Sequence, residues 1–147
     1  MIRIIKTNPL FFAFLFPAVV DGIVTLLGQS PEYWTNRVVN EASPAYYFLL
    51  VSPLLFILGA ILWFLFWYWA MKRLKEPFNL FLMFVFIAGH SWGSSSWLMG
   101  ILKRAGIYIP SNQISVITAW SFLVVYFLLI SALATYCLQV YFKSNKS

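Results

Sequence analysis

The sequence has little of what builds metal or redox sites. Its 147 residues include one cysteine, one histidine and four acidic residues. A single cysteine excludes an intramolecular disulfide and a cysteine-built metal site. One imidazole and four carboxylates leave few ligands for zinc or related ions. We therefore expect no metal centre built from the side chains of this chain.

Charge is also scarce. Charged residues make up 10% of the chain and apolar residues 62%, whereas soluble domains have about 25% charged and about 45–50% apolar residues. A soluble fold of this size could not bury so much apolar surface, but a bilayer solvates it. The net charge of +6 comes from short basic clusters between apolar runs, which favours a lipid surface over nucleic acid as partner. We expect contacts with membrane lipids and with other membrane subunits.

Apolar runs long enough to cross a bilayer, about 20 residues each, recur four times. They predict an all-α fold in which residues 1–147 form a single transmembrane domain, an antiparallel four-helix bundle. The second and fourth runs exceed the minimum length, so we expect them to tilt or to emerge into the interface. The expected spans are about 9–28, 45–71, 78–101 and 115–142.

The distribution of Lys and Arg predicts an orientation. Seven basic residues fall on the side of the two termini and the second connection, and three fall on the opposite side. Because cytoplasmic loops are enriched in Lys and Arg, we expect both termini in the cytoplasm. The expected location is the bacterial inner membrane, with an organelle membrane as the alternative. The seven residues are Arg3, Lys6, Lys72, Arg73, Lys75, Lys143 and Lys146, and the three are Arg37, Lys103 and Arg104.

The first outer loop carries a helix-start signal. Ser30 is a suitable N-cap, Pro31 suits the first helical position, and Glu32 complements the helix dipole. We predict a short interfacial helix near 31–40 that places Trp34 on the membrane surface.

The stretch GHSWG, residues 89–93, fits G-x-S-x-G, the nucleophile-elbow pattern of serine hydrolases. That chemistry needs a separate histidine as base, and the only histidine of this chain is His90, inside the motif. On a helix, His90 and Ser91 are about 100° apart and do not face each other. We therefore do not interpret GHSWG as an elbow.

Small residues in the same segment recur along one side of the expected helix. At about 100° per residue they fall within an arc of about 60°. Such a stripe is typical of close helix–helix packing in lipid. The alternative is a groove for a flat ligand such as a lipid, a quinone or a tetrapyrrole. The stripe consists of Gly89, Gly93, Ser96 and Gly100.

Polar residues inside the spans predict a layer in the outer half of the bundle. The ionisable residues are Asp21 and His90, and each should face the interior because an exposed charge in hydrocarbon is costly. Thr25 lies one turn from Asp21, and Ser94 lies one turn from His90. With a helical rise of about 1.5 Å per residue, the other residues of the expected layer lie at a similar depth in the membrane. The expected layer is Asp21, Thr25, Ser52, His90, Ser94, Trp97 and Ser121, with Glu41 at its outer mouth.

Four hypotheses for function follow. The first is a non-catalytic accessory or assembly subunit of a larger membrane complex, because the chain has few polar residues and many aromatic ones. The second is a binding or transport module for a lipid, quinone or other amphiphile at Asp21 and His90. The third is a pigment- or haem-binding subunit with His90 as axial ligand. The fourth is an intramembrane hydrolase or transferase that uses His90 and Ser94.

Overall fold

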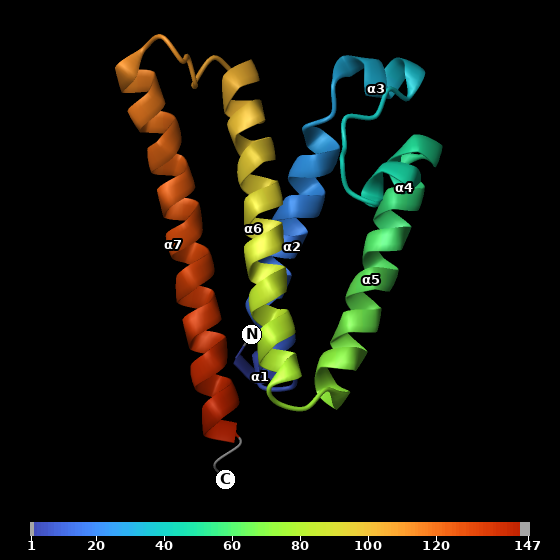
Figure 1. Ribbon diagram of the computed structural model, residues 1–147, viewed down its shortest axis with the longest axis vertical. Coiled ribbons are helices and arrows are strands. Elements are labelled where there is room, and N and C mark those ends of the chain that lie inside the picture. The colour runs from blue at the N-terminus through green and yellow to red at the C-terminus, as the bar shows by residue number, and fades with distance from the viewer. Residues whose placement is uncertain (1, 145–147) are drawn as a thin grey trace.

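The computed structural model describes residues 2–144, with side chains from residue 4, and this part of the chain is helical without strands. The Arg3 side chain and Lys146, counted above for the orientation, lie outside the described residues. Seven helices follow one another along the chain (Figure 1). They are α1 (Ile2–Ile5), α2 (Pro9–Leu27), α3 (Pro31–Asn36), α4 (Ala45–Val51), α5 (Pro53–Arg73), α6 (Phe78–Arg104) and α7 (Gln113–Ser144).

Three helices, α2, α5 and α7, are long and apolar enough to cross a membrane. They confirm the expectation of an all-helical protein with membrane-spanning segments. The helix over the third expected span, α6, is 27 residues long but is not among these three. From Gly89 onwards it contains His90 and several serine and glycine residues, which makes it more polar than the other long helices.

The second expected span is not one helix. It divides at Ser52 into α4 and α5, because Ser52 has extended backbone angles and Pro53 begins the next helix. Proline offers no backbone N–H and disfavours helical geometry in the residue before it. The Ser52 hydroxyl accepts a hydrogen bond from the Leu55 amide at 3.0 Å and so caps α5.

The short outer helix is present but ends earlier than expected. Helix α3 begins at Pro31 and stops at Asn36, because Arg37 has a left-handed conformation with φ of 58°. Ser30 occupies the N-cap position without a side-chain bond to the helix backbone. Its hydroxyl instead bonds to the carboxylate of Glu32 and lowers the pKa of that group.

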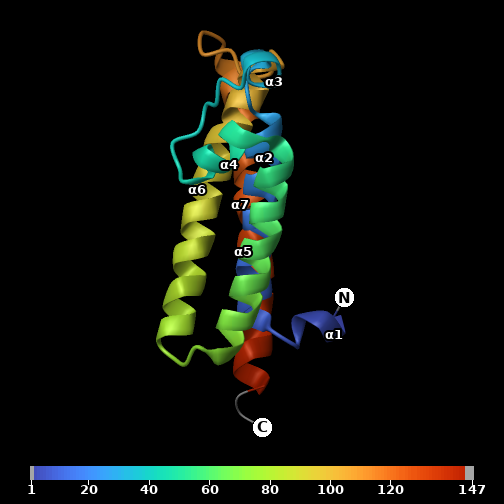
Figure 2. The same ribbon diagram turned by 90° about the vertical axis from the view of Figure 1, so that its right-hand side faces the viewer.

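Helix α2 lies at the centre of the molecule. It packs against α6, α7 and α5, and its contacts with α6 are the most extensive. Figures 1 and 2 show α5 on one side of the central pair and α7 on the other. The α5–α6 connection, α1 and the end of α7 lie at one end of the molecule, while α3, α4 and the α6–α7 connection lie at the other.

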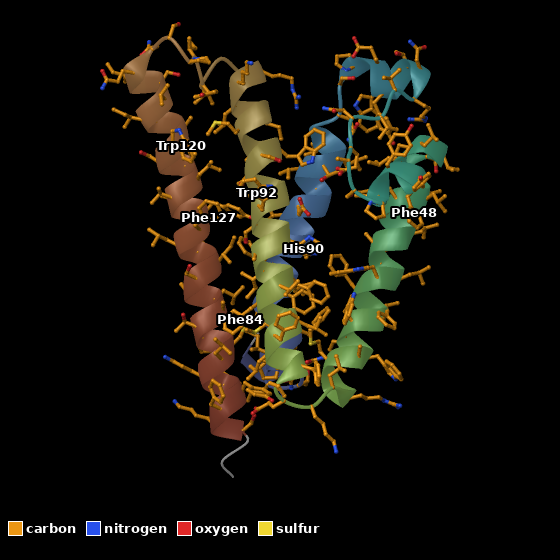
Figure 3. All side chains as sticks on the ribbon, in the orientation of Figure 1. Phe48, Phe84, His90, Trp92, Trp120 and Phe127 are labelled. Carbon is orange, nitrogen blue, oxygen red and sulfur yellow. The ribbon has the colours of Figure 1, made fainter. Side chains whose placement is uncertain are left out.

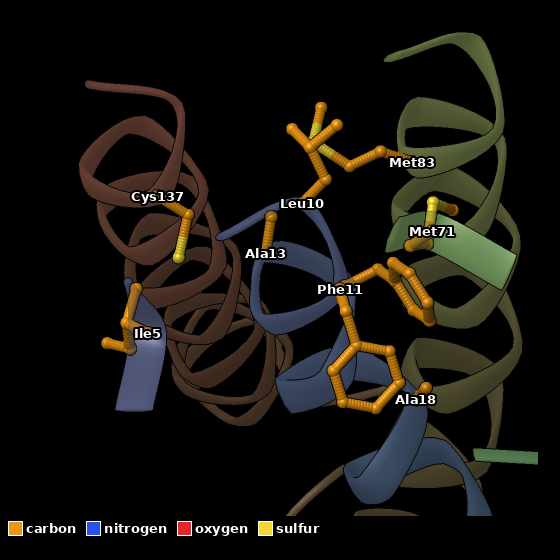
Figure 4. Packing of buried hydrophobic residues seen from close by; sticks show 9 residues of the cluster. Ile5, Leu10, Phe11, Ala13, Ala18, Met71, Met83 and Cys137 are labelled. Carbon is orange, nitrogen blue, oxygen red and sulfur yellow. The ribbon is translucent and has the colours of Figure 1, made fainter. Parts of the chain in front are cut away.

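The buried apolar core lies near the end that carries α1. Side chains of α2 fill it, and Met71 of α5, Met83 of α6 and Cys137 of α7 pack against them (Figure 4). Phe14 is fully buried and lies with its ring 5.0 Å from that of Phe86. Towards the opposite end α5 diverges from α6 (Figure 1). The helices therefore pack tightly at the end that carries α1 and are further apart towards the end that carries α3.

Candidate functional site

Asp21 of α2 and His90 of α6, the ionisable residues expected inside the spans, meet between these two helices. His90 Nδ1 lies 2.8 Å from Asp21 Oδ2. An ionised carboxylate only accepts hydrogen bonds, so Nδ1 donates when Asp21 is charged. A Cβ placed on Gly93 would lie 2.8 Å from Asp21 Oδ1. The absence of a side chain at Gly93 therefore allows the carboxylate to approach α6.

Aromatic rings hold the imidazole in place. The Trp63 ring of α5 contacts His90 edge to face, with centroids 5.2 Å apart, and Phe86 lies one turn below it at 6.4 Å. Within the described residues, no hydrogen-bond partner is found for the second ring nitrogen, Nε2. The His90 side chain is 25% exposed and that of Asp21 21% exposed. The Asp21–His90 pair is thus partly exposed, and aromatic rings of α5 and α6 hold the imidazole ring in position.

The exposed part of the pair lines a cavity of about 590 Å³ between α2, α5 and α6, bordered at the end that carries α3 by the segment that leads into α4. In Figure 3, His90 lies on the part of α6 nearest α2, and Phe48 lies on α4 across the space. The wall is mostly apolar, and six aromatic rings contribute to it. They belong to Phe48, Phe56, Trp63, Phe64, Phe86 and Trp97.

Glycines leave part of the wall smooth. Gly22 of α2 and Gly89 of α6 line the cavity, and a Cβ on either would meet no atom within 4 Å. The residues of the small-residue stripe have different surroundings along α6. Gly93 lies against Asp21, but Gly89 and Gly100 have open space beside them, and Ser96 is exposed with its hydroxyl bonded to the Gly93 carbonyl.

The buried face of α6 is instead formed by Asn79, Met83, Ser91 and Ser94. The Ser94 hydroxyl lies 2.6 Å from the His90 carbonyl and 2.7 Å from the hydroxyl of Tyr126 on α7. Ser94 therefore bonds to the backbone of His90 rather than to its ring, and it does not line the cavity. The Ser91 hydroxyl is buried and has no hydrogen-bond partner in the described part of the chain.

The polar layer expected from the sequence is only partly assembled. Thr25 and Trp97 line the cavity with Asp21 and His90. Ser52 and Ser121 do not belong to this group. Ser52 caps α5, and Ser121 is on an exposed face of α7 with its hydroxyl bonded to its own helix at the Ile117 carbonyl.

Glu41 lies at the end of the cavity nearest α3 and α4. Glu41 and Trp97 line both the main cavity and a second, more polar cavity of about 290 Å³. The loop that carries Glu41 is fastened by Gln29, whose side chain bonds to both backbone groups of Asn40. Trp97 packs directly on Gly28, where no side chain could fit beside it. These two contacts fix the mouth between the end of α2 and the outer part of α6.

Sequence reasoning missed the contribution of α5 and α7 to the site. The sequence places Trp63 in an aromatic run typical of a membrane interface, and it indicates no role for Phe86 and Tyr126 beyond their apolar spans. The aromatic run of α5 was a visible signal, but its position relative to His90 depends on the rotation of each helix in the bundle.

Searches against protein-family models, curated proteins and solved structures find no match to this chain.

Proposed function

We propose that this chain is a membrane-embedded binding or transport module that holds a single amphiphile, such as a lipid or a quinone, between α2, α5 and α6. The observation that carries this proposal is the cavity of about 590 Å³ with mostly apolar walls and one hydrogen-bonded pair, Asp21 and His90. Sites for small ligands are commonly concave, apolar spaces of about 300–1,000 Å³ with a few polar groups that orient the ligand.

In this proposal α6 crosses the membrane as well as α2, α5 and α7, and both termini face the cytoplasm of a bacterial cell. The side of the bundle that carries α1 and the end of α7 also carries Lys72, Arg73 and Lys75 in and after the last turn of α5. Lys72 lies over the Tyr68 ring and Arg73 over the Trp69 ring. A belt of aromatic rings with basic residues beyond it supports a cytoplasmic membrane surface at that end.

The other hypotheses have less support. Exposed apolar residues on α5 and α7 suit lipid as well as a partner subunit, so they do not favour an assembly role by themselves. A hydrolase with Ser94 as nucleophile would need His90 Nε2 beside that hydroxyl, whereas the Ser94 hydroxyl bonds to the His90 carbonyl and to the Tyr126 hydroxyl. For a tetrapyrrole, the absorption spectrum of the purified protein is the direct test.

A leucine side chain introduced into the cavity tests the proposal. In Gly89→Leu the new side chain would occupy the cavity, because a Cβ there meets no atom within 4 Å. Gly100→Leu is the matched control, since Gly100 on the same helix has equally open surroundings but does not line the cavity. The probe is ω-bromododecanol, whose bromine quenches tryptophan fluorescence when it lies close to Trp63 or Trp97.

In phosphatidylcholine nanodiscs, we expect saturable quenching in the parent protein and in Gly100→Leu, and its loss in Gly89→Leu. Gly22→Leu on α2 should repeat the loss, because Gly22 lines the same space. Quenching that rises linearly with the probe, and equally in all four proteins, would mean that it reports only partitioning into lipid, and the proposal would be wrong.

A further inference from the structure

The charges around the cavity differ in sign from those of the rest of the chain. The sequence has ten Lys and Arg residues and four acidic ones. Two of the four acids, Asp21 and Glu41, line the cavity, whereas no Lys or Arg of the described residues does. Although the protein has a net charge of +6, the charged and titratable side chains that line the cavity are two acids and His90.

The Asp21 carboxylate has hydrogen-bonding capacity to spare. A carboxylate offers about four acceptor positions, and within the described residues Asp21 has one hydrogen-bond partner, His90. Its Oδ1 lies against Gly93, which has no side chain to donate. Because hydrogen bonds to a charged group gain strength where water is scarce, a donor on the ligand would be stabilised here.

The other groups that face the space also suit a donor or a cation. The free Nε2 of His90 accepts a hydrogen bond when the ring is neutral. Trp63 and Trp97 both line the cavity, and the Trp63 ring lies against His90. Tryptophan faces attract cations at close range. A carboxylate or phosphate head group would instead face two acids, with His90 but no Lys or Arg of the described residues beside it.

Building on the amphiphile-binding function proposed above, we propose that the natural ligand is a cationic amphiphile whose protonated amine lies between Asp21 and the Trp63 and Trp97 rings. Its apolar body then extends along Phe64 and Phe86 towards the core. Glu41, at the mouth shared with the second cavity, attracts the ammonium group as the ligand approaches.

Three probes of equal chain length test the head-group chemistry: ω-bromododecylamine, ω-bromododecanol and ω-bromododecanoate. At pH 7 the first is a cation, the second neutral and the third an anion. Titrations in nanodiscs of zwitterionic phosphatidylcholine, corrected for partitioning into protein-free discs, give a Kd from tryptophan quenching. We expect the amine to bind at least about tenfold more tightly than the carboxylate, with the alcohol between them.

The variant Asp21→Asn separates charge from shape. It should weaken binding of the amine by about 10- to 100-fold, the range for loss of a charge-assisted hydrogen bond, and change binding of the alcohol by less than about threefold. Glu76→Gln is the control, because Glu76 lies in the α5–α6 connection away from the cavity and should leave all three constants unchanged. If Asp21→Asn does not fold, Glu41→Gln gives a smaller loss specific to the amine.

The two proposals fail in different ways. If the carboxylate binds as tightly as the amine, or Asp21→Asn leaves the preference for amine over alcohol unchanged, the ligand is not a cation. In that case Gly89→Leu would still abolish binding of all three probes, and the amphiphile site would stand. If Gly89→Leu and Gly100→Leu bind every probe alike, there is no ligand site in this cavity, and both proposals are wrong.

Discussion

The hydrogen bond between Ser94 and Tyr126 should be a major polar link between α6 and α7. Ser94 is fully buried, Tyr126 is 9% exposed, and their hydroxyl oxygens lie 2.7 Å apart. Because the Ser94 hydroxyl is also 2.6 Å from the His90 carbonyl, we assign Ser94 as donor to that carbonyl and as acceptor from Tyr126. The arrangement predicts that removing the two hydroxyl groups has unequal effects.

In Tyr126→Phe, Ser94 keeps its bond to the His90 carbonyl, so the loss should be that of one hydrogen bond, about 0.5–1.5 kcal/mol. In Ser94→Ala, the Tyr126 hydroxyl remains buried without its partner, and the cost should rise to about 1–3 kcal/mol. The coupling energy from the double-mutant cycle should lie near 0.6 kcal/mol and below about 1.7 kcal/mol, the range found for hydrogen bonds between membrane helices.

Unfolding by sodium dodecyl sulfate in mixed micelles, followed by circular dichroism, measures these free energies. Tyr136→Phe is the control, because Tyr136 is on the same helix, is 37% exposed and should change the free energy of unfolding little. A Tyr126→Phe variant less stable than Ser94→Ala, or a coupling energy indistinguishable from zero, would refute the assigned donor and acceptor roles.

Four further predictions follow from single contacts. Gly28→Ala should lower the free energy of thermal unfolding because the new Cβ would collide with Trp97. Gly22→Ala in α2 is the comparison: its Cβ would meet no atom, so the variant should be neutral or more stable by up to about 1 kcal/mol. Asn8→Ala should cost about 1–3 kcal/mol in the same assay, because the buried Asn8 amide donates to the Tyr68 carbonyl at 2.7 Å and joins α2 to α5. Burial raises the pKa of Tyr33 above its ordinary value, so the folded state should lose stability as pH rises beyond about 10, and Tyr33→Phe should make that loss smaller in alkaline unfolding experiments. A reporter that is active only in the cytoplasm should be active when fused after the end of α7 and inactive when inserted between α6 and α7; the reverse result would overturn the proposed orientation.

The sequence predicts the long helices well because apolar runs and prolines define them directly. Helix α2 begins and ends within one residue of the expected span, and Pro9 stands at its first position. The break at Ser52 had a local signal in Pro53, but the continuous apolar run concealed it. The left-handed conformation of Arg37 had no such signal, because α3 ends within a loop whose course is set by contacts such as Gln29 with Asn40.

The site was predictable at its centre and not at its walls. Asp21 and His90 were expected to face the interior because isolated charges in lipid are costly. The helix rise put Ser94 rather than His90 level with Asp21, so the sequence left open whether Asp21 and His90 pair. Depth alone also suggested Ser121, but a serine on a helix satisfies its own hydroxyl through the carbonyl one turn earlier, as Ser121 does at Ile117. Serines therefore give weak information about which face of a helix is buried.

The Asp21–His90 pair also constrains how the chain is made. Its two members are 69 residues apart in the sequence, and at about 5–20 residues per second synthesis separates them by roughly 3–14 s. During that interval α2 carries a carboxylate whose imidazole partner has not yet been translated. The early intermediate must therefore keep Asp21 hydrated, protonated or bound by another molecule, and α2 reaches its final position only when α6 arrives.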